Sequence, residues 1–173
     1  MHRMTVSAVA SRRATSLNPA AAPRIERVDP LHADAQGLLA QAALDLQPLY
    51  PALFGPGLPP PTNLPAVPRS AYLLAYIGTV AAGSAALHPL GDTLAEVRRV
   101  YVPPTWRRRG VATALMVALE DEARALGYGL LRLETGARQT AALTLYQGLG
   151  WRRIPPFGVY ADEPGCACFE KTL

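Results

Sequence analysis

A short basic run, Arg107-Arg108-Arg109-Gly110-Val111-Ala112, stands at the junction of two segments with different periodicities. Residues 93–102 before it alternate in the manner of a strand, and Pro103-Pro104 ends that pattern. Residues 109–126 repeat their apolar side chains at helical spacing, and Gly127 is a typical helix stop. The run therefore predicts a strand–turn–helix unit, which buries its apolar surfaces only where a sheet packs against helices.

Strict alternation also predicts which side chains of residues 93–102 share a face. Glu96, Arg98 and Val100 fall on one side of the predicted strand. Val97 and Arg99 fall on the other.

The chemistry of the basic run favours a bound anion. The first backbone N–H groups of a helix have no partner within it, and the helix dipole adds positive charge there. Gly110 has no Cβ and Ala112 only a methyl group, so a diphosphate can approach the backbone closely. Arg107, Arg108 and Arg109 oppose the helix dipole, a cost that an anion would offset. A solvated basic turn is the alternative reading.

Further strands and helices are predicted on both sides of this unit. Gly78-Thr79 indicates a hairpin between two apolar strands. The segments expected as strands are 24–28, 71–77, 80–88, 130–133, 151–154 and 166–171, and those expected as helices are 31–46 and 140–149. The predicted fold class is α/β (α+β), with a mixed, mostly antiparallel central sheet and helices on both faces.

Two segments lie outside this pattern. Residues 1–22 lack acidic side chains and an apolar signal-peptide core, so we expect a flexible leader before one domain of residues 23–173. Their composition would also suit an organellar transit peptide. Residues 50–68 are proline-rich, which predicts neither a regular helix nor a central strand. This connection either covers a substrate pocket or is a passive linker.

Composition argues against several classes of partner. The formal net charge is +4, and Arg3, Arg12 and Arg13 of the leader carry three of those charges. The domain is thus nearly neutral, which disfavours nucleic-acid binding. No apolar stretch approaches the roughly 20 residues of a membrane span. Cys166 and Cys168 are expected to be packed thiols in a reducing, cytoplasmic setting, and the histidines show no metal-ligand spacing, so no metal is expected.

Motifs in a fixed order resemble those of one known family. Arg107 to Ala112 matches the pattern Gln/Arg-x-x-Gly-x-Gly/Ala, and residues 95–102 are similar to the strand that precedes it. Residues 133–136 are similar to the next strand end, and residues 145–151 to a helix end of the form Leu-Tyr-x-x-x-Gly-Phe, with Trp151 in place of Phe. From about Ile25 onward the chain resembles the GNAT superfamily of acetyl-CoA-dependent N-acetyltransferases.

This resemblance implies a GNAT-like acyl-CoA N-acyltransferase fold, with acetyl-CoA as co-substrate between two splayed central strands. Amides of Arg108 to Thr113 would hold the diphosphate. The contacts expected for the donor are Val100, Tyr101, Val102, Arg107, Arg108, Arg109, Gly110, Val111, Ala112 and Thr113. An amide near Tyr101 would stabilise the oxyanion. The implied reaction is direct attack by a primary amine of a small-molecule acceptor.

Four side chains are candidates for the chemistry. Glu96 is the expected base, because an unpaired carboxylate is costly mid-strand, although an ion pair with Arg98 would also explain it. Tyr146 occupies the position from which the family's tyrosine protonates the departing thiolate, and a structural tyrosine is the alternative. Glu134, at a strand end, and Tyr160, in a loop, are expected to bind substrate.

Two other readings stay open on the sequence. A non-catalytic acyl-CoA sensor on the same fold would carry the same donor motif. An exposed C-terminal strand is also compatible with a homodimer.

Overall fold

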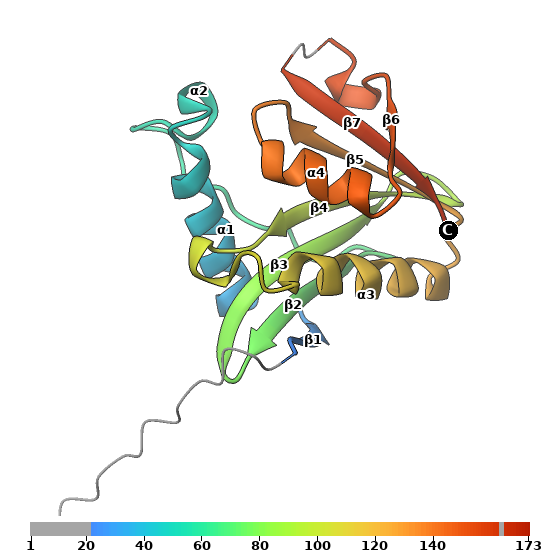
Figure 1. Ribbon diagram of the computed structural model, residues 1–173, viewed down its shortest axis with the longest axis horizontal. Helices are drawn as coiled ribbons and strands as arrows, with labels where there is room; N and C mark the ends of the chain where they lie inside the picture. Colours follow the sequence, from blue (N-terminus) through green and yellow to red (C-terminus); the bar gives the residue numbers. More distant parts are fainter. Residues whose placement is uncertain (1–21, 163–164) are drawn as a thin grey trace, which may run out of the picture.

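The computed structural model describes residues 22–162 and 165–173, so nearly all of the predicted leader lies outside the described residues. One sheet of seven strands, ordered β1-β2-β3-β4-β5-β7-β6, forms the centre (Figure 1). The strands are β1 (Arg24–Arg27), β2 (Ala71–Ile77), β3 (Val80–Pro89), β4 (Leu94–Tyr101), β5 (Leu130–Gly136), β6 (Arg152–Ile154) and β7 (Cys166–Thr172). The helices are α1 (Ala33–Leu46), α2 (Pro51–Phe54), α3 (Val111–Ala125) and α4 (Thr140–Gly148).

The sheet consists of two antiparallel parts that meet at one parallel pairing. Strands β1 to β4 pair antiparallel in sequence, and β7 pairs antiparallel with both β5 and β6. β4 and β5 run parallel, and their pairing extends only from Leu94 with Leu130 to Val97 with Leu133. Beyond Val97 and Leu133 both strands continue without pairing to each other, which confirms the mixed, mostly antiparallel sheet and opens a gap within it.

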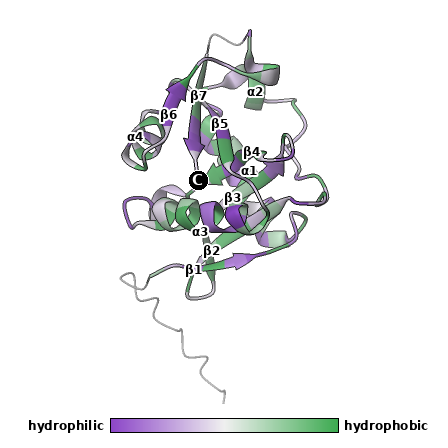
Figure 2. Cartoon of the chain, turned by 90° about the vertical axis from the view of Figure 1, so that its right-hand side faces the viewer, coloured by the Kyte–Doolittle hydropathy of each residue, from purple (hydrophilic) through white to green (hydrophobic). Residues whose placement is uncertain are grey.

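Helices cover both faces of the sheet. The larger core lies between the sheet, α3 and α4 and includes Leu115, Leu119, Leu133 and Phe169. A smaller core lies between α1 and alternate side chains of β2, such as Tyr72, which point away from the larger core. Figure 2 shows the apolar colour along β2, whereas the charged strands β1 and β6 are hydrophilic.

The alternation predicted for residues 93–102 is wrong beyond Arg98. The register with β3 shifts between Ser84 and Ala86, and Arg99 adopts a left-handed conformation with φ 57°. This bulge adds one residue to β4 and reverses the faces that follow it. As a result, Val97 and Val100 pack against the same core, although the alternation placed them on opposite faces.

The proline-rich connection is also more regular than its composition predicts. Residues 51–54 form α2, with Pro51 in the first turn, where its missing N–H leaves no helix hydrogen bond unmade. Prolines thus start this short helix, and only the remainder of the segment lacks a helix or a strand.

An ion pair connects α3 to the far part of the sheet. Lys171 Nζ lies 2.7 and 2.8 Å from the two carboxylate oxygens of the buried Glu120. The pairing of Glu120 with Arg124 expected from helical spacing is present at 3.9 Å. Lys171 is therefore the nearer partner, and it ties α3 to β7.

Among the described residues, no helix is long and apolar enough to cross a membrane.

Candidate active site

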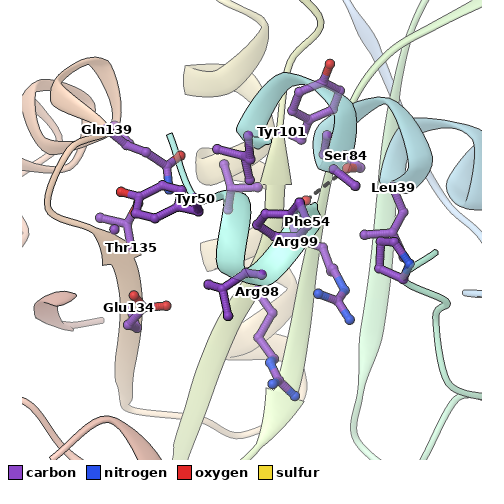
Figure 3. A pocket seen from close by; sticks show the side chains of 18 of the residues that line it. Leu39, Tyr50, Phe54, Ser84, Arg98, Arg99, Tyr101, Glu134, Thr135 and Gln139 are labelled. Carbon is purple, nitrogen blue, oxygen red and sulfur yellow. Dashed lines mark hydrogen bonds between the residues drawn. The ribbon is translucent and has the colours of Figure 1, made fainter. Parts of the chain in front are cut away.

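A cavity of about 370 Å³ occupies the gap that opens where β4 and β5 stop pairing. The two strands contribute residues 97–101 and 134–136, and α1, α2 and α4 complete the wall. Figure 3 shows Arg98 and Arg99 extending from β4 on one side, with Glu134 and Thr135 on β5 opposite. A volume of this size suits a small molecule or the reactive end of a longer one.

The bulge in β4 shapes one wall of this cavity. The buried Ser84 hydroxyl donates a 2.9 Å hydrogen bond to the Arg99 carbonyl, which secures the irregular backbone to β3. A bulge leaves two consecutive side chains on one side of the strand. Arg98 and Arg99 accordingly line the same two cavities, the main one and a smaller one of about 110 Å³.

The turn before α3 presents a row of backbone amides. Arg108 and Gly110 have φ values of 60° and 76°, and Gly110 is the N-cap of α3 without a side-chain cap. The first helix hydrogen bond runs from the Ala114 amide to the Gly110 carbonyl at 2.9 Å. Within the described residues, the amides from Arg108 to Thr113 donate to no acceptor outside the helix, so they fit an anion.

The three arginines of this turn have different surroundings. Arg107 donates to the Val102 carbonyl at 2.9 Å and forms an ion pair with Asp45 of α1 at 2.9 Å. Arg109 lies over the Trp106 ring, with its guanidinium carbon 5.2 Å from the ring centre. Arg107 thereby joins α1 to the turn, a contact that sequence spacing does not reveal.

The Asp45 carboxylate also accepts a 2.9 Å hydrogen bond from the Tyr101 hydroxyl. Partial burial and this hydrogen bond raise the pKa of Tyr101 well above its usual value. The side chain of Tyr101 therefore packs toward α1, while its backbone belongs to the cavity wall.

Tyr146 lies at the α4 side of the cavity. Its side chain is buried, and its ring contacts Trp151 and Phe169 at centroid distances of 6.1 and 5.7 Å. Burial raises the pKa of Tyr146, and the nearby charge of Glu134 raises it further. The phenol is thus neutral and can donate a proton at neutral pH.

Glu96 and Tyr160 meet just outside the lining of the cavity. The Tyr160 hydroxyl donates to the buried Glu96 carboxylate at 2.9 Å, and Arg98 Nε lies 3.6 Å from the other carboxylate oxygen. Burial and the hydrogen bond to Glu96 raise the pKa of Tyr160 to about 12. The ion pair with Arg98 that alternation suggested is therefore present, and Glu96 lies one residue before the gap opens.

Metal-ligating groups do not gather in this region. No cluster of three or more histidine, cysteine, aspartate or glutamate side chains that could hold a metal occurs in residues 22–162 or 165–173. Neither Cys166 nor Cys168 forms a disulfide, and of the two only Cys166 borders the cavity.

A family match agrees with this geometry. Residues 42–151, which contain the gap, the amide row and Tyr146, match the Acetyltransferase (GNAT) family. The chain belongs to this family.

Individual GNAT relatives agree in sequence and in fold. An "IAA acetyltransferase" from Azospirillum brasilense is 41% identical over 78 residues, which cover 45% of this chain and 51% of that protein. The chain thus matches about half the length of that relative.

Solved structures show the same architecture over most of the chain. A proposed acyl-CoA N-acyltransferase from Klebsiella pneumoniae has a TM-score of 0.71 and 30% identity, over 87% of this chain and 97% of that one. A GNAT family acetyltransferase from Elizabethkingia anophelis, with acetyl-CoA bound, has a TM-score of 0.61 and 18% identity, over 87% and 98% of the two chains. The GNAT-like fold expected from the motifs is therefore confirmed.

Two residues that border the cavity were not identified by the sequence motifs. Tyr50 precedes α2, and its hydroxyl packs against Gly136 and accepts a 3.2 Å hydrogen bond from the Arg138 amide. Tyr72 of β2 borders both cavities. Neither stands in a motif, and the only signal for Tyr50 is its place at the start of the proline-rich connection.

Proposed function

We propose that this protein transfers the acetyl group of acetyl-CoA to a primary amine of a small-molecule acceptor by direct attack. The observation that carries the proposal is the gap between β4 and β5, with an open row of helix amides beside it and a neutral phenol inside it. The family match supports acyl transfer, and the acetyl-CoA complex of a structural relative supports this donor.

The residues present fit an acyl-CoA at this gap. Amides from Arg108 to Thr113 suit a diphosphate, and Gly110 keeps the approach open because a Cβ there would meet nothing within 4 Å, while its φ of 76° favours glycine. The backbone of Val100 to Val102 borders the gap and suits pairing with an extended arm. Bound acetyl-CoA supplies an activated thioester for attack by an amine.

Tyr146 is proposed as the general acid that protonates the departing thiolate. Its raised pKa keeps the proton on the phenol oxygen at neutral pH, where a donor is required. The surrounding rings of Trp151 and Phe169 fix the orientation of the side chain.

Glu96 is proposed as the base, acting through the Tyr160 hydroxyl. Because neither Glu96 nor Tyr160 borders the cavity, a water is needed between this pair and the acceptor amine. The Tyr160 hydroxyl can pass a proton to Glu96 while it accepts one from that water, which in turn takes the proton of the amine. Glu134, which borders the cavity opposite Arg98, is proposed to bind the ammonium form of the acceptor before it loses its proton.

Thiol release from acetyl-CoA with a panel of primary amines tests this function. We expect amine-dependent release, with turnover lowered about 100-fold or more in Tyr146→Phe, because a general acid contributes roughly 10²–10⁴ in rate. Acetyl-CoA affinity, measured by calorimetry, should not change. Tyr128→Phe is the matched control, since Tyr128 is equally buried but donates to the Arg69 carbonyl away from the cavity.

Two results would contradict these assignments. Acetyl-CoA binding without any amine-dependent release would favour the non-catalytic sensor. Unchanged turnover in Tyr146→Phe would remove Tyr146 from the mechanism.

A further inference from the structure

Arg99 extends a charged side chain into the cavities without a partner to neutralise it. Among the described residues, its guanidinium forms no hydrogen bond and no ion pair, whereas Arg98 beside it is paired with Glu96. Partial burial and the charge of Arg98 both lower the pKa of Arg99, and the opposing charge of Glu96 has a smaller effect. The cation is therefore disfavoured, and a bound anion would stabilise it.

A second polar group lies unsatisfied on the same wall. The Tyr72 hydroxyl is buried and has no hydrogen-bond partner in the structure, and its residue is only 3% exposed. An unsatisfied buried hydroxyl is destabilising, because it has lost its hydrogen bonds to water without replacing them. Tyr72 and Arg99 border both cavities.

The backbone of Arg99 adopts an unfavourable conformation that directs its side chain toward the cavity. Its φ of 57° lies in the left-handed region, which is unfavourable for a residue with a side chain. The bulge turns Arg99 onto the side that carries Arg98, as Figure 3 shows, instead of the opposite face of the sheet. The chain thus maintains a strained conformation that aims a guanidinium at the cavity.

From these contacts we infer that the acceptor carries a carboxylate besides its amine, bound by the Arg99 guanidinium and the Tyr72 hydroxyl. A guanidinium can donate two parallel hydrogen bonds to a carboxylate, and the phenol adds a third donor. The acceptor is therefore of the amino-acid class.

The opposite wall suits the other end of such a molecule. Glu134 lies across the gap on β5 (Figure 3), and its charge acts on Tyr146. A zwitterionic acceptor would thus place its carboxylate toward Arg99 and its amine toward Glu134 and the acyl group. This inference rests on the proposed function, because it assigns the acceptor of that same site.

Matched pairs of amines provide the test. The probes are the common α-amino acids, β-alanine and γ-aminobutyrate, each compared with its carboxamide. In the unaltered protein we expect kcat/KM for the preferred acid to exceed that for its amide by at least about tenfold, the value of one charged hydrogen-bonded contact.

Three variants connect this preference to its residues. Arg99→Gln keeps a Cβ at the left-handed position, so the backbone cost is unchanged, and it should abolish the preference for the acid. Arg99→Lys should restore part of it, and Tyr72→Phe should weaken it. Arg152→Gln is the matched control, since Arg152 is exposed on β6 outside both cavities.

Binding distinguishes failure of this inference from failure of the proposed function. Calorimetry of each acid and amide with the CoA-saturated protein needs no turnover. Acid-selective binding that Arg99→Gln removes supports the carboxylate site even if no amine is acetylated. The inference is overturned if acids and amides are equivalent in both rate and binding, or if Arg99→Gln weakens both members of a pair equally.

Discussion

At the scale of single residues, the region of the site contains three tyrosines that lose their phenol protons only at unusually high pH. Tyr101, Tyr146 and Tyr160 all have raised pKa values, and burial is the largest cause in each case. Their hydroxyls have different partners, since Tyr101 binds Asp45, Tyr160 binds Glu96, and Tyr146 lies among rings at the cavity. We propose proton transfer only for the last two, Tyr160 toward the acceptor and Tyr146 toward the donor.

Replacing Tyr160 by Phe should change how stability depends on alkaline pH. A pKa of about 12 in the folded state exceeds that of the unfolded chain, so the folded protein binds more protons above about pH 10. Its free energy of unfolding must then fall as pH rises from about 10 toward 12, and the fall should be shallower in Tyr160→Phe. Urea denaturation at several alkaline pH values measures this slope.

Tyr101 and Tyr146 contribute slopes of the same sign in both proteins, so the difference between them isolates Tyr160. Equal slopes would show that folding does not raise the pKa of Tyr160. At neutral pH we expect the variant to lose about 1 kcal/mol with the hydrogen bond.

The candidate residues differ in how far sequence could find them. Tyr146 and Glu134 stand in motifs, and both line the cavity, although their roles are still to be tested. Tyr72 reads as an ordinary apolar strand residue, because its unsatisfied hydroxyl is a property of tertiary packing. The contact between Tyr50 and Gly136 joins distant parts of the chain, which local pattern does not encode.

At the scale of elements, the segment from α1 to α2 forms a side of the cavity that helix and strand patterns do not predict. The Tyr50 side chain packs against Gly136, and the Arg138 guanidinium donates a 3.0 Å hydrogen bond to the Leu49 carbonyl. The start of the proline-rich connection is therefore attached to the turn between β5 and α4. This contact favours a covering role for this part of the connection over that of a passive linker.

Gly136→Ala should disrupt this attachment. Its new Cβ would overlap the Tyr50 ring and hydroxyl, and we expect a loss of about 1–3 kcal/mol in stability together with a raised KM for the acceptor. Chemical denaturation and steady-state kinetics measure the two effects. Gly129→Ala is the control, since a Cβ there meets nothing within 4 Å.

Truncation of Tyr50 provides a second check on the same contact. In a Tyr50→Ala background, Gly136→Ala should cost little, because the overlapping ring is gone. Additive losses in the double variant would show that the two residues do not interact.

Element types were predictable where periodicity was strong, and their details were not. The hairpin at Gly78-Thr79 and both long helices form as expected, with ends shifted by one or two residues. The bulge at Arg99 was missed because an inserted residue leaves no mark in an apolar–polar pattern. It is stabilised instead by a distant hydroxyl, that of Ser84.

At the scale of the whole molecule, two antiparallel parts of a sheet are joined by a short parallel pairing and by α3. The parallel pairing contributes four residue pairs, from Leu94 to Val97. α3 packs against β1 to β4, and its Glu120 reaches Lys171 in the other part. That ion pair therefore helps to set how the two parts sit against each other.

Lys171→Met should destabilise the protein by about 1–3 kcal/mol, because it leaves the buried Glu120 carboxylate without its nearest partner. Denaturant unfolding should show a lower midpoint with an unchanged slope. Arg124→Gln removes the 3.9 Å pair with Glu120 and an exposed 3.0 Å pair with Asp121, and it should cost less than about 1 kcal/mol.

Adding Glu120→Gln to Lys171→Met should recover part of the loss, since the buried charge is then removed. A double variant no more stable than Lys171→Met would contradict this account of the ion pair.

The gap between β4 and β5 also limits how stable this protein can become. Closing it would add ladder hydrogen bonds beyond Val97 and Leu133, each with a net value near 1 kcal/mol. Selection for thermal resistance alone would favour substitutions that draw the two strands together, and those same changes would fill the gap in which we propose that the donor binds. Stabilising variants obtained without an activity screen should therefore cluster along this seam, and they should be inactive.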